Sequence, residues 1–276
     1  QMLLRPALIA LLLIVSGVVV KGHASAPAAL AFNLAATVTC VAVLSYMGRR
    51  FMPKDAAVAK PVYLTSQWAK TALSMMFITS FTMILNQTDL VMVGTLLSPR
   101  DAGIYGAAAR VATFLTFAIN VVNLTAAPMM ARFYSEGRLD SLQRMLNWAG
   151  WGSLIFATPL CAAVIMFPGS IMQLFGPEFA AGAGALTILA LARWIAAVTG
   201  AAGYLMSMSG HDRQAATILG GSAAANVFLN ALLIKPYGIT GAAVSTLLTT
   251  ALWTGLMVRF GRRYTGVWPV PSLRFH

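Results

Sequence analysis

Ionisable side chains that could bind an anion or carry a proton stand inside long apolar stretches of this chain. Asp89 lies in a run that extends from about Trp68 to Leu97, and Arg110 and Arg193 lie in two further runs. A carboxylate can neutralise a cation, and a guanidinium can hold a phosphate through charge-assisted hydrogen bonds. Charges at the middle of a membrane helix cost on the order of 2.5 to 3.5 kcal/mol each, so they usually face a bundle interior or a wet cavity. These three residues are the first candidates for a binding site.

Two uncharged polar residues share a helical face with the carboxylate. Thr82, Asn86 and Asp89 follow spacings of four and three residues, which place them on one face of a helix. We expect this polar stripe to belong to the same substrate-binding site as the two arginines.

The depth of the charged residues predicts how they meet. Asp89 and Arg110 each lie roughly 10 to 14 Å below the same end of their predicted spans, so neighbouring antiparallel helices would let them form an ion pair. Such a pair either serves function or only fixes helix register. Arg193 lies about 20 Å into a later span, where it either binds a ligand or satisfies carbonyl groups at a kink beside Gly200 or Gly203.

Asparagine pairs supply further polar groups inside apolar runs. Asn120 with Asn123, and Asn226 with Asn230, lie three and four residues apart. Asparagines in membrane helices commonly form hydrogen bonds between helices, worth about 1 kcal/mol. We expect that role here, with a direct part in transport as the alternative.

The elements that must position these groups are membrane-spanning helices. Hydrophobic residues make up 59% and charged residues 9% of the 276 residues, against roughly 45 to 50% and about 25% in soluble domains. The apolar runs approach the roughly 20 residues that a helix needs to cross a bilayer, and they lack the alternation of a transmembrane barrel. The sequence predicts an all-α integral membrane protein with about eight spans: 4–20, 28–47, 68–97, 103–130, 148–167, 180–208, 214–234 and 238–260. The third and fourth spans are long enough to require tilt, a kink or protrusion.

The distribution of basic residues orients these spans. Alternating spans place 14 of the 19 Lys and Arg on one side and three on the other, with Arg110 and Arg193 inside spans. Because cytoplasmic loops carry the excess of Lys and Arg, we expect a cytoplasmic carboxyl terminus. A nucleic-acid site would gather its basic residues on one face, so the net charge of +12 does not indicate a nucleic-acid partner.

The loops favour a protein that is not an enzyme. Those on the less basic side are short, and the acids they offer are Asp101 and Glu178. Cys40 and Cys161 lie inside apolar runs without metal-ligand spacing, so neither a metal nor a cofactor is expected. Residues 138–146 carry apolar side chains on one helical face and charges on the other. This segment is either a helix lying in the membrane interface or an ordinary connector.

Several short motifs occur in a characteristic order. They are Asp-Leu-Val-Met-Val-Gly at 89–94, Leu-Ser-Pro-Arg-Asp-Ala-Gly-Ile-Tyr at 97–105, Ala-Pro at 127–128, Leu-Phe-Gly-Pro-Glu-Phe at 174–179, Met-Ser-Gly-His-Asp-Arg at 208–213 and Pro-Tyr-Gly-Ile-Thr-Gly-Ala-Ala at 236–243. Over roughly residues 60 to 265 their order and spacing resemble bacterial polysaccharide or oligosaccharide flippases. These flippases belong to the multidrug/oligosaccharidyl-lipid/polysaccharide exporter superfamily.

The resemblance implies a fold of two six-helix bundles around a central cavity that opens alternately to either side of the membrane. This chain would carry spans five to twelve: residues 1–60 would hold the end of the amino-terminal bundle and a basic linker, and residues 61–276 the carboxyl-terminal bundle. The first four spans would be missing from the chain.

The resemblance also implies a function and a location. The substrate would be an oligosaccharide on a polyprenyl diphosphate, moved across the bacterial inner membrane with no cofactor. Membrane lipid, and a polysaccharide polymerase or glycosyltransferases of the same pathway, would be its partners. A cation-coupled multidrug exporter of the same superfamily, or a membrane-embedded glycosyl-transfer enzyme, are the alternatives.

Overall fold

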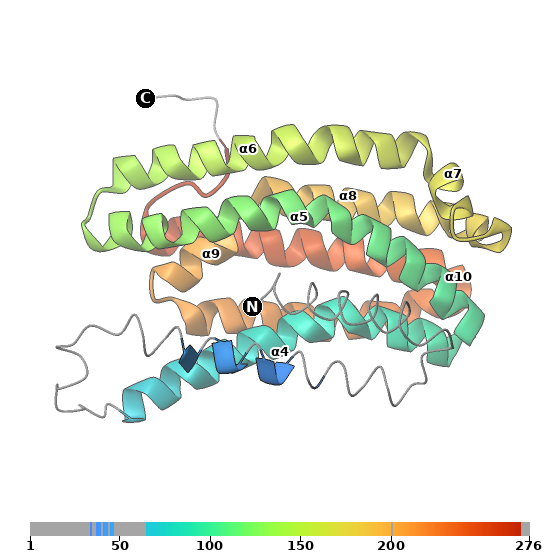
Figure 1. Cartoon of the computed structure of the whole chain (residues 1–276), viewed down its shortest axis with the longest axis horizontal. Coiled ribbons are helices and arrows are strands. Elements are labelled where there is room, and N and C mark those ends of the chain that lie inside the picture. The colour runs from blue at the N-terminus through green and yellow to red at the C-terminus, as the bar shows by residue number, and fades with distance from the viewer. Residues whose placement is uncertain are drawn as a thin grey trace. The chain divides into compact units, whose positions relative to one another are not determined.

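The computed structural model (Figure 1) describes residues 65–199 and 201–271, together with helical positions at 34, 37–39, 41–43, 45 and 46. Contacts divide the chain into two units, Gln1–Leu64 and Thr65–His276. Apart from those helical positions, the first two predicted spans and the basic linker lie outside the described residues. The assignment of residues 1–60 and 61–276 to two bundles stays a prediction.

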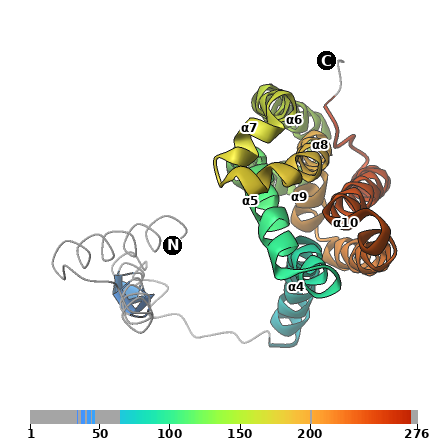
Figure 2. The same cartoon turned by 90° about the vertical axis from the view of Figure 1, so that its right-hand side faces the viewer.

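The second unit is built of helices throughout its described residues. In chain order these are α4 (Thr65–Leu96), α5 (Pro99–Ser135), α6 (Leu139–Met166), α7 (Pro168–Gln173), the 3₁₀ helix η1 (Pro177–Gly182), α8 (Ala183–Thr199), α9 (Ala201–Met208) and α10 (Asp212–Thr265). The long helices lie side by side along a common direction (Figure 1), and Figure 2 shows them end-on. Helix α8 packs against α5, α6 and α10, while α4 packs against α10 and α5.

Small residues allow these helices to approach closely. Ala108 and Ala112 on α5, Ala190 on α8, and Ala242 and Ala243 on α10 are all fully buried and belong to one core cluster. In lipid, helix association depends on close packing rather than on hydrophobicity, because the surrounding acyl chains are equally apolar. The Gly/Ala-rich segments 103–109 and 238–244, which open two of the predicted spans, therefore contribute to packing interfaces.

Helix α5 begins with a capping arrangement that its sequence encodes. The Asp101 backbone N–H donates to Ser98 Oγ at 3.1 Å, and the Ser98 hydroxyl donates to Asp101 Oδ2 at 2.6 Å. Pro99 occupies the first helical position, where its missing N–H costs no hydrogen bond. The cap starts the helix four residues before the predicted position and fixes the direction in which α5 leaves the turn.

Helix α10 is a hairpin of two arms rather than one rod. Gly238 interrupts it with φ 61° and ψ −143°, a backbone conformation that glycine adopts without steric cost. The Ser245 hydroxyl on the second arm donates to the Asn226 carbonyl on the first at 3.2 Å, so the arms run antiparallel. A methyl group at Gly241 would lie 2.6 Å from the Leu233 carbonyl carbon, which is why the crossing requires glycine.

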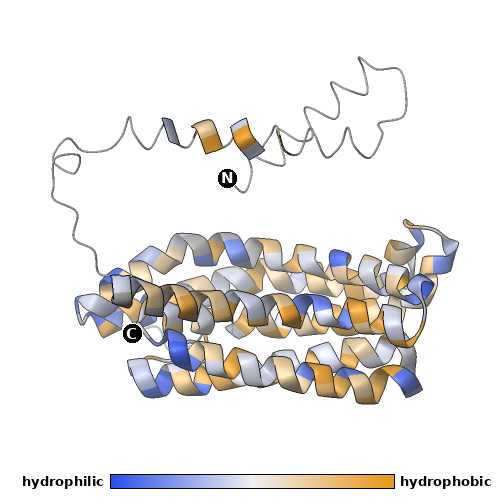
Figure 3. Cartoon of the chain, turned by 90° about the horizontal axis from the view of Figure 1, so that it is seen from below, coloured by the Kyte–Doolittle hydropathy of each residue, from blue (hydrophilic) through white to orange (hydrophobic). Residues whose placement is uncertain are grey.

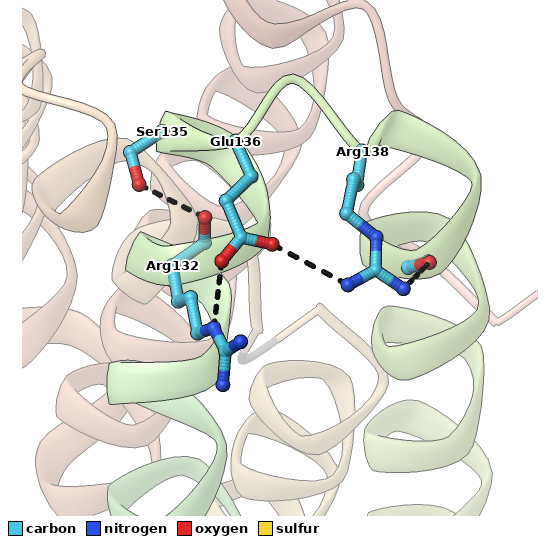
Figure 4. A network of polar contacts seen from close by, with 5 residues as sticks. Arg132, Ser135, Glu136 and Arg138 are labelled. Carbon is cyan, nitrogen blue, oxygen red and sulfur yellow. Dashed lines mark hydrogen bonds and ion pairs between the residues drawn. The ribbon is translucent and has the colours of Figure 1, made fainter.

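The turn from α5 to α6 is held by charged side chains (Figure 4). Arg132 Nε donates to one oxygen of Glu136 at 2.7 Å, and Arg138 reaches the other at 3.3 Å. The hydrogen bond from Arg132 holds the pKa of Glu136 below its ordinary value. From Leu139, residues 138–146 are the first turns of α6, with Leu142 and Leu146 fully buried. The segment is therefore continuous with a long helix, and a position in the membrane interface stays a prediction.

Length and apolar composition qualify four of the described helical segments as membrane spans: Met75–Leu96, Leu139–Met166, Pro177–Thr199 and Asp212–Thr265, the last of which doubles back at Gly238. Figure 3 shows apolar and neutral residues along the helices and hydrophilic ones near both ends of the bundle. The prediction of an all-α membrane protein is confirmed. The count of eight spans stays a prediction.

Candidate functional site

Asp89, on α4, is buried where this helix meets three other helical segments. Its side chain is 4% exposed. Asn230 Nδ2, on the first arm of α10, donates to Asp89 Oδ1 at 2.6 Å, and the Tyr105 hydroxyl on α5 donates to Oδ2 at 3.0 Å. The Thr246 hydroxyl, on the second arm of α10, donates to the same Oδ2. The carboxylate thus ties α4 to α5 and to both arms of the hairpin.

The polar cluster continues between the arms of α10. Asn230 Nδ2 also donates to Asn226 Oδ1 at 3.2 Å, and Asn226 Nδ2 donates to Thr249 Oγ1 at 3.4 Å. Both asparagines are fully buried. The expected role of this pair in joining helices is confirmed. Among the described residues, Asn230 Oδ1 has no hydrogen-bond partner although it is buried, so one acceptor in the cluster is unused.

Arg193, on α8, is the cation that lies beside this cluster. Its Nη2 donates to Asn86 Oδ1 on α4 at 3.4 Å, one helical turn before Asp89. The Arg193 Nε is buried and has no partner within the described part of the chain. The guanidinium therefore donates one hydrogen bond to a neutral amide, and its Nε N–H is left without an acceptor among the described side chains.

Arg110 does not pair with Asp89, so the predicted ion pair is wrong. The Asp89 oxygens are occupied by Tyr105, Asn230 and Thr246, and Arg110 is exposed. Among the side chains that the structure describes, the ion pairs are Arg100–Glu178, Arg132–Glu136 and Arg138–Glu136. Tyr105 and Arg110 are five residues apart, which separates them by about 140° around the helix axis. Tyr105 faces Asp89, and Arg110 points elsewhere.

The polar stripe on α4 divides between the surface and the interior. Thr82 and Asn86 are exposed, and each bonds its own helix: Thr82 donates to the Ile78 carbonyl at 2.7 Å, and Asn86 Nδ2 donates to the Thr82 carbonyl at 2.7 Å. Asn86 Oδ1 is the acceptor for Arg193. The structure therefore joins Asn86, Asp89 and Arg193, leaves Thr82 on the adjoining surface, and separates Arg110 from them.

Sequence reasoning missed Tyr105 and Thr246 as members of the site. Tyr105 lies in the Gly/Ala-rich segment 103–109, and Thr246 lies two residues after the Gly/Ala-rich segment 238–244. The available signal was helical spacing: Ser245 and Thr249 are four residues apart, with Thr246 beside them, in an otherwise apolar run. That spacing predicts a buried polar stripe on the last span.

The cluster has a limited chemical repertoire. It can change the set of donors to its one carboxylate, because the Thr246 hydroxyl also lies 3.1 Å from the Ala242 carbonyl and can donate there instead. It can present a guanidinium to an anion. Within the described residues, no group of three or more His, Cys, Asp or Glu side chains is arranged to hold a metal ion.

Fold and site together define a polytopic all-α membrane protein with an ionisable centre among its helices. The MatE family model matches residues 71–232, which include Asp89, Tyr105, Arg193 and Asn230. The chain belongs to the MatE family, so its predicted membership of the exporter superfamily is confirmed.

Curated relatives agree with this assignment. The chain is 27% identical over 176 residues to a probable low-salt glycan biosynthesis flippase, Agl15, and 24% identical over 174 residues to a probable flippase, AglR, both of Haloferax volcanii. Each alignment covers 62% of this chain and 37% of the relative. An uncharacterized membrane protein of Methanocaldococcus jannaschii, MJ1068, is 29% identical over 120 residues, which cover 43% of this chain and 24% of that protein. The chain thus spans little more than a third of the first two relatives.

Proposed function

We propose that this chain is part of a flippase that moves an oligosaccharide linked to a polyprenyl diphosphate across a membrane by alternating access. The observation that carries the proposal is Arg193, a guanidinium held among apolar helices by a neutral amide, with its Nε unpartnered among the described residues. A diphosphate offers charged oxygens that guanidinium groups bind bidentately. The glycan-biosynthesis name of one relative agrees with such a substrate.

Arg110 contributes a second cation from the exposed face of α5. That face also carries Thr113 and Asn120, while α4 presents Thr82 and Asn86. A charged side chain on the exposed face of a membrane helix, such as that of Arg110, requires water or another polar surface rather than lipid. In the proposed protein these faces of α4 and α5 line the cavity that the substrate headgroup enters, with Thr82 and Asn86 as sugar contacts.

Asp89 couples occupancy of the site to helix movement in this scheme. An anion bound to Arg193 weakens the field that this arginine exerts on the carboxylate. Asp89 then exchanges hydrogen-bond partners or takes a proton. The hydrogen bonds that join α4 to α5 and α10 change as a result. The sequence-based predictions of a bacterial inner membrane, a cytoplasmic carboxyl terminus, and polymerase or glycosyltransferase partners belong to this proposal.

The test is translocation of a fluorescent lipid-diphosphate sugar in proteoliposomes, followed by its accessibility to a sugar-modifying enzyme outside. A hydrogen bond to a charged group contributes about 1.5 to 3 kcal/mol, so Arg193→Gln should slow translocation roughly tenfold or more. Asp89→Asn should also slow it, because the amide cannot accept the same set of donors. Arg100→Gln is the matched control, since Arg100 is exposed and pairs with Glu178.

Unchanged translocation in Arg193→Gln and Asp89→Asn, with normal insertion of both proteins, would overturn the proposal. A strong loss in Arg100→Gln would also overturn it, because charge loss far from the site would then suffice.

Cation-coupled export of a small molecule is the second candidate function. The buried Asp89 and the unpartnered Asn230 Oδ1 favour it, because both are oxygens that could face a proton or a small cation. If an imposed proton or sodium gradient drives efflux of a cationic dye and Asp89→Asn abolishes that efflux, this second function replaces the first.

A glycosyl-transfer enzyme would need carboxylate side chains that are available to act as general acid or base. The two acids predicted in the short loops have other partners: Asp101 belongs to the α5 cap, and Glu178 pairs with Arg100. We therefore propose a transporter rather than an enzyme.

A further inference from the structure

A cavity of about 320 Å³ opens at the end of α10, lined by Arg259, Phe260, Arg262 and Arg263. Their spacing places three guanidinium groups around one opening in the last turns of the helix. All three arginines are exposed. This cluster lies far along α10 from Asn230 and Thr246 and has no part in the function proposed above.

The positive charge around the cavity is not balanced by the described acids. The ion pairs found in residues 65–271 involve Arg100, Arg132 and Arg138, and none of these lines the cavity. A helix carboxyl terminus attracts cations, but its dipole amounts to roughly half an elementary charge. Three neighbouring guanidinium groups carry more positive charge than that dipole can balance. The cavity therefore keeps a net positive charge that an anion can neutralise.

One of these arginines is held in place by the chain that follows the helix. Helix α10 ends at Thr265, Gly266 caps it, and the chain then passes toward α6 (Figure 1). The Trp268 backbone N–H donates to Gln143 Oε1 at 2.6 Å, and Gln143 Nε2 donates to the Trp268 carbonyl at 2.8 Å. The Arg262 guanidinium carbon lies 4.8 Å from the centre of the Trp268 ring. This strap orients Arg262 before any ligand arrives.

Aromatic side chains place the cavity at the level of lipid headgroups. Phe260 and Tyr264 stack with ring centres 6.1 Å apart, and Tyr264 and Trp268 are both partly exposed at this end. Tyr and Trp concentrate where membrane meets water, and arginines beside them face the headgroups of the nearer leaflet. The residue types around the cavity therefore suit a position among lipid phosphates.

We propose that this cavity binds a phosphate-bearing anion through Arg259, Arg262 and Arg263. The shared chemistry is a phosphate group on a headgroup or ion of net negative charge, supplied either by an anionic phospholipid or by soluble phosphate. Guanidinium groups bind such oxygens bidentately, and basic pockets beside membrane helices recognise anionic headgroups in this way.

The test measures the melting temperature of the purified chain in neutral detergent. Three additions are compared: phosphatidylglycerol, phosphatidylcholine and inorganic phosphate. Phosphatidylglycerol should raise the melting temperature, phosphatidylcholine should not, and high salt should reduce the shift because it screens exposed charges. Arg259→Gln/Arg263→Gln should lose about half of the shift or more, since two of three cations are gone.

The matched control is Arg144→Gln/Arg213→Gln. It removes the same charge at the same end of the bundle, where Gln143 contacts Trp268 and where the His211 ring lies 4.8 Å from that of Tyr264. The control should keep the full shift. A larger shift with phosphatidylglycerol than with inorganic phosphate assigns a lipid ligand, and an equal shift assigns phosphate itself.

Two outcomes would overturn the proposal. One is that neither phosphatidylglycerol nor inorganic phosphate raises the melting temperature of the unaltered chain. The other is an equal loss in Arg259→Gln/Arg263→Gln and in the control, which would mean that overall charge rather than this cavity binds the anion.

Discussion

The exposed faces of α5 and α6 differ in kind although the two helices pack against each other. Between Trp148 and Met166, Thr158 is the one polar side chain that α6 exposes, and Trp194 Nε1 donates to it at 3.1 Å. The exposed residues of α5 between Gly103 and Pro128 include Arg110, Thr113, Asn120 and Thr125 beside Phe114 and Phe117.

The difference indicates which face meets lipid. A face that is apolar apart from one hydrogen-bonded threonine suits acyl chains. A face with an arginine at mid-helix requires water or another polar surface, because an unpaired charge in hydrocarbon is costly. Solvent exposure does not distinguish the two faces, because both are exposed in this unit. The polarity of their side chains does distinguish them.

The largest expected effect comes from placing a charge on each face. Ile155→Arg puts a guanidinium on the α6 face and should cost on the order of 2.5 to 3.5 kcal/mol. Phe117→Arg should cost much less, because the surroundings that accept Arg110 also accept a second arginine. Both residues are similarly exposed, at 65% and 68%. The fraction of each variant that inserts, followed by glycosylation mapping, measures the difference, and equal losses would remove the distinction between the faces.

A smaller effect should appear in the reactivity of single cysteines. Thr113→Cys and Phe156→Cys, made after Cys40 and Cys161 are replaced by alanine, are compared for labelling by a charged maleimide in intact membranes. A thiol reacts as its thiolate, which forms in water and not in lipid. The α5 cysteine should therefore react about tenfold faster or more. If the α6 cysteine reacts at the same rate, the α6 face is also wet.

The smallest expected effect concerns single hydroxyl groups. Thr158→Val removes the acceptor of Trp194 Nε1 and should destabilise the protein by about 0.6 kcal/mol, the average for hydrogen bonds between membrane helices. Thr113→Val should be nearly neutral, because the Thr113 hydroxyl bonds the Ala109 carbonyl of its own helix. Unfolding in a mixed-detergent titration measures both variants. A larger loss in Thr113→Val would mean that the α5 face makes contacts beyond its own helix.

The helices were predictable because apolar runs and turn residues determine them locally. The predicted spans at 68–97 and 214–234 correspond to α4 and to the first arm of α10, and the break at Gly238 follows from glycine in the Pro-Tyr-Gly segment. Helix ends were less accurate where polar residues continue a helix beyond its apolar run, as in α6, which begins at Leu139 rather than at Trp148.

The level of the site residues along their helices was predictable from the sequence, but their hydrogen-bond partners were not. Counting residues places Asp89 and Arg110 at similar levels, but partner choice depends on direction around the helix axis, which differs by about 100° for each residue. Tyr105 therefore occupies the position expected for Arg110. The approach of Arg193 to Asn86 depends on how α8 packs against its neighbours, and no local pattern encodes that.

The reversal at Gly238 has a mechanical consequence for Asp89. Its partners Asn230 and Thr246 stand on opposite arms of one hairpin, and the Asn226–Thr249 bond stitches these arms together. Moving α4 away from the hairpin would therefore break hydrogen bonds to both arms, whereas rotation of the Thr246 hydroxyl toward the Ala242 carbonyl breaks the bond to the second arm alone.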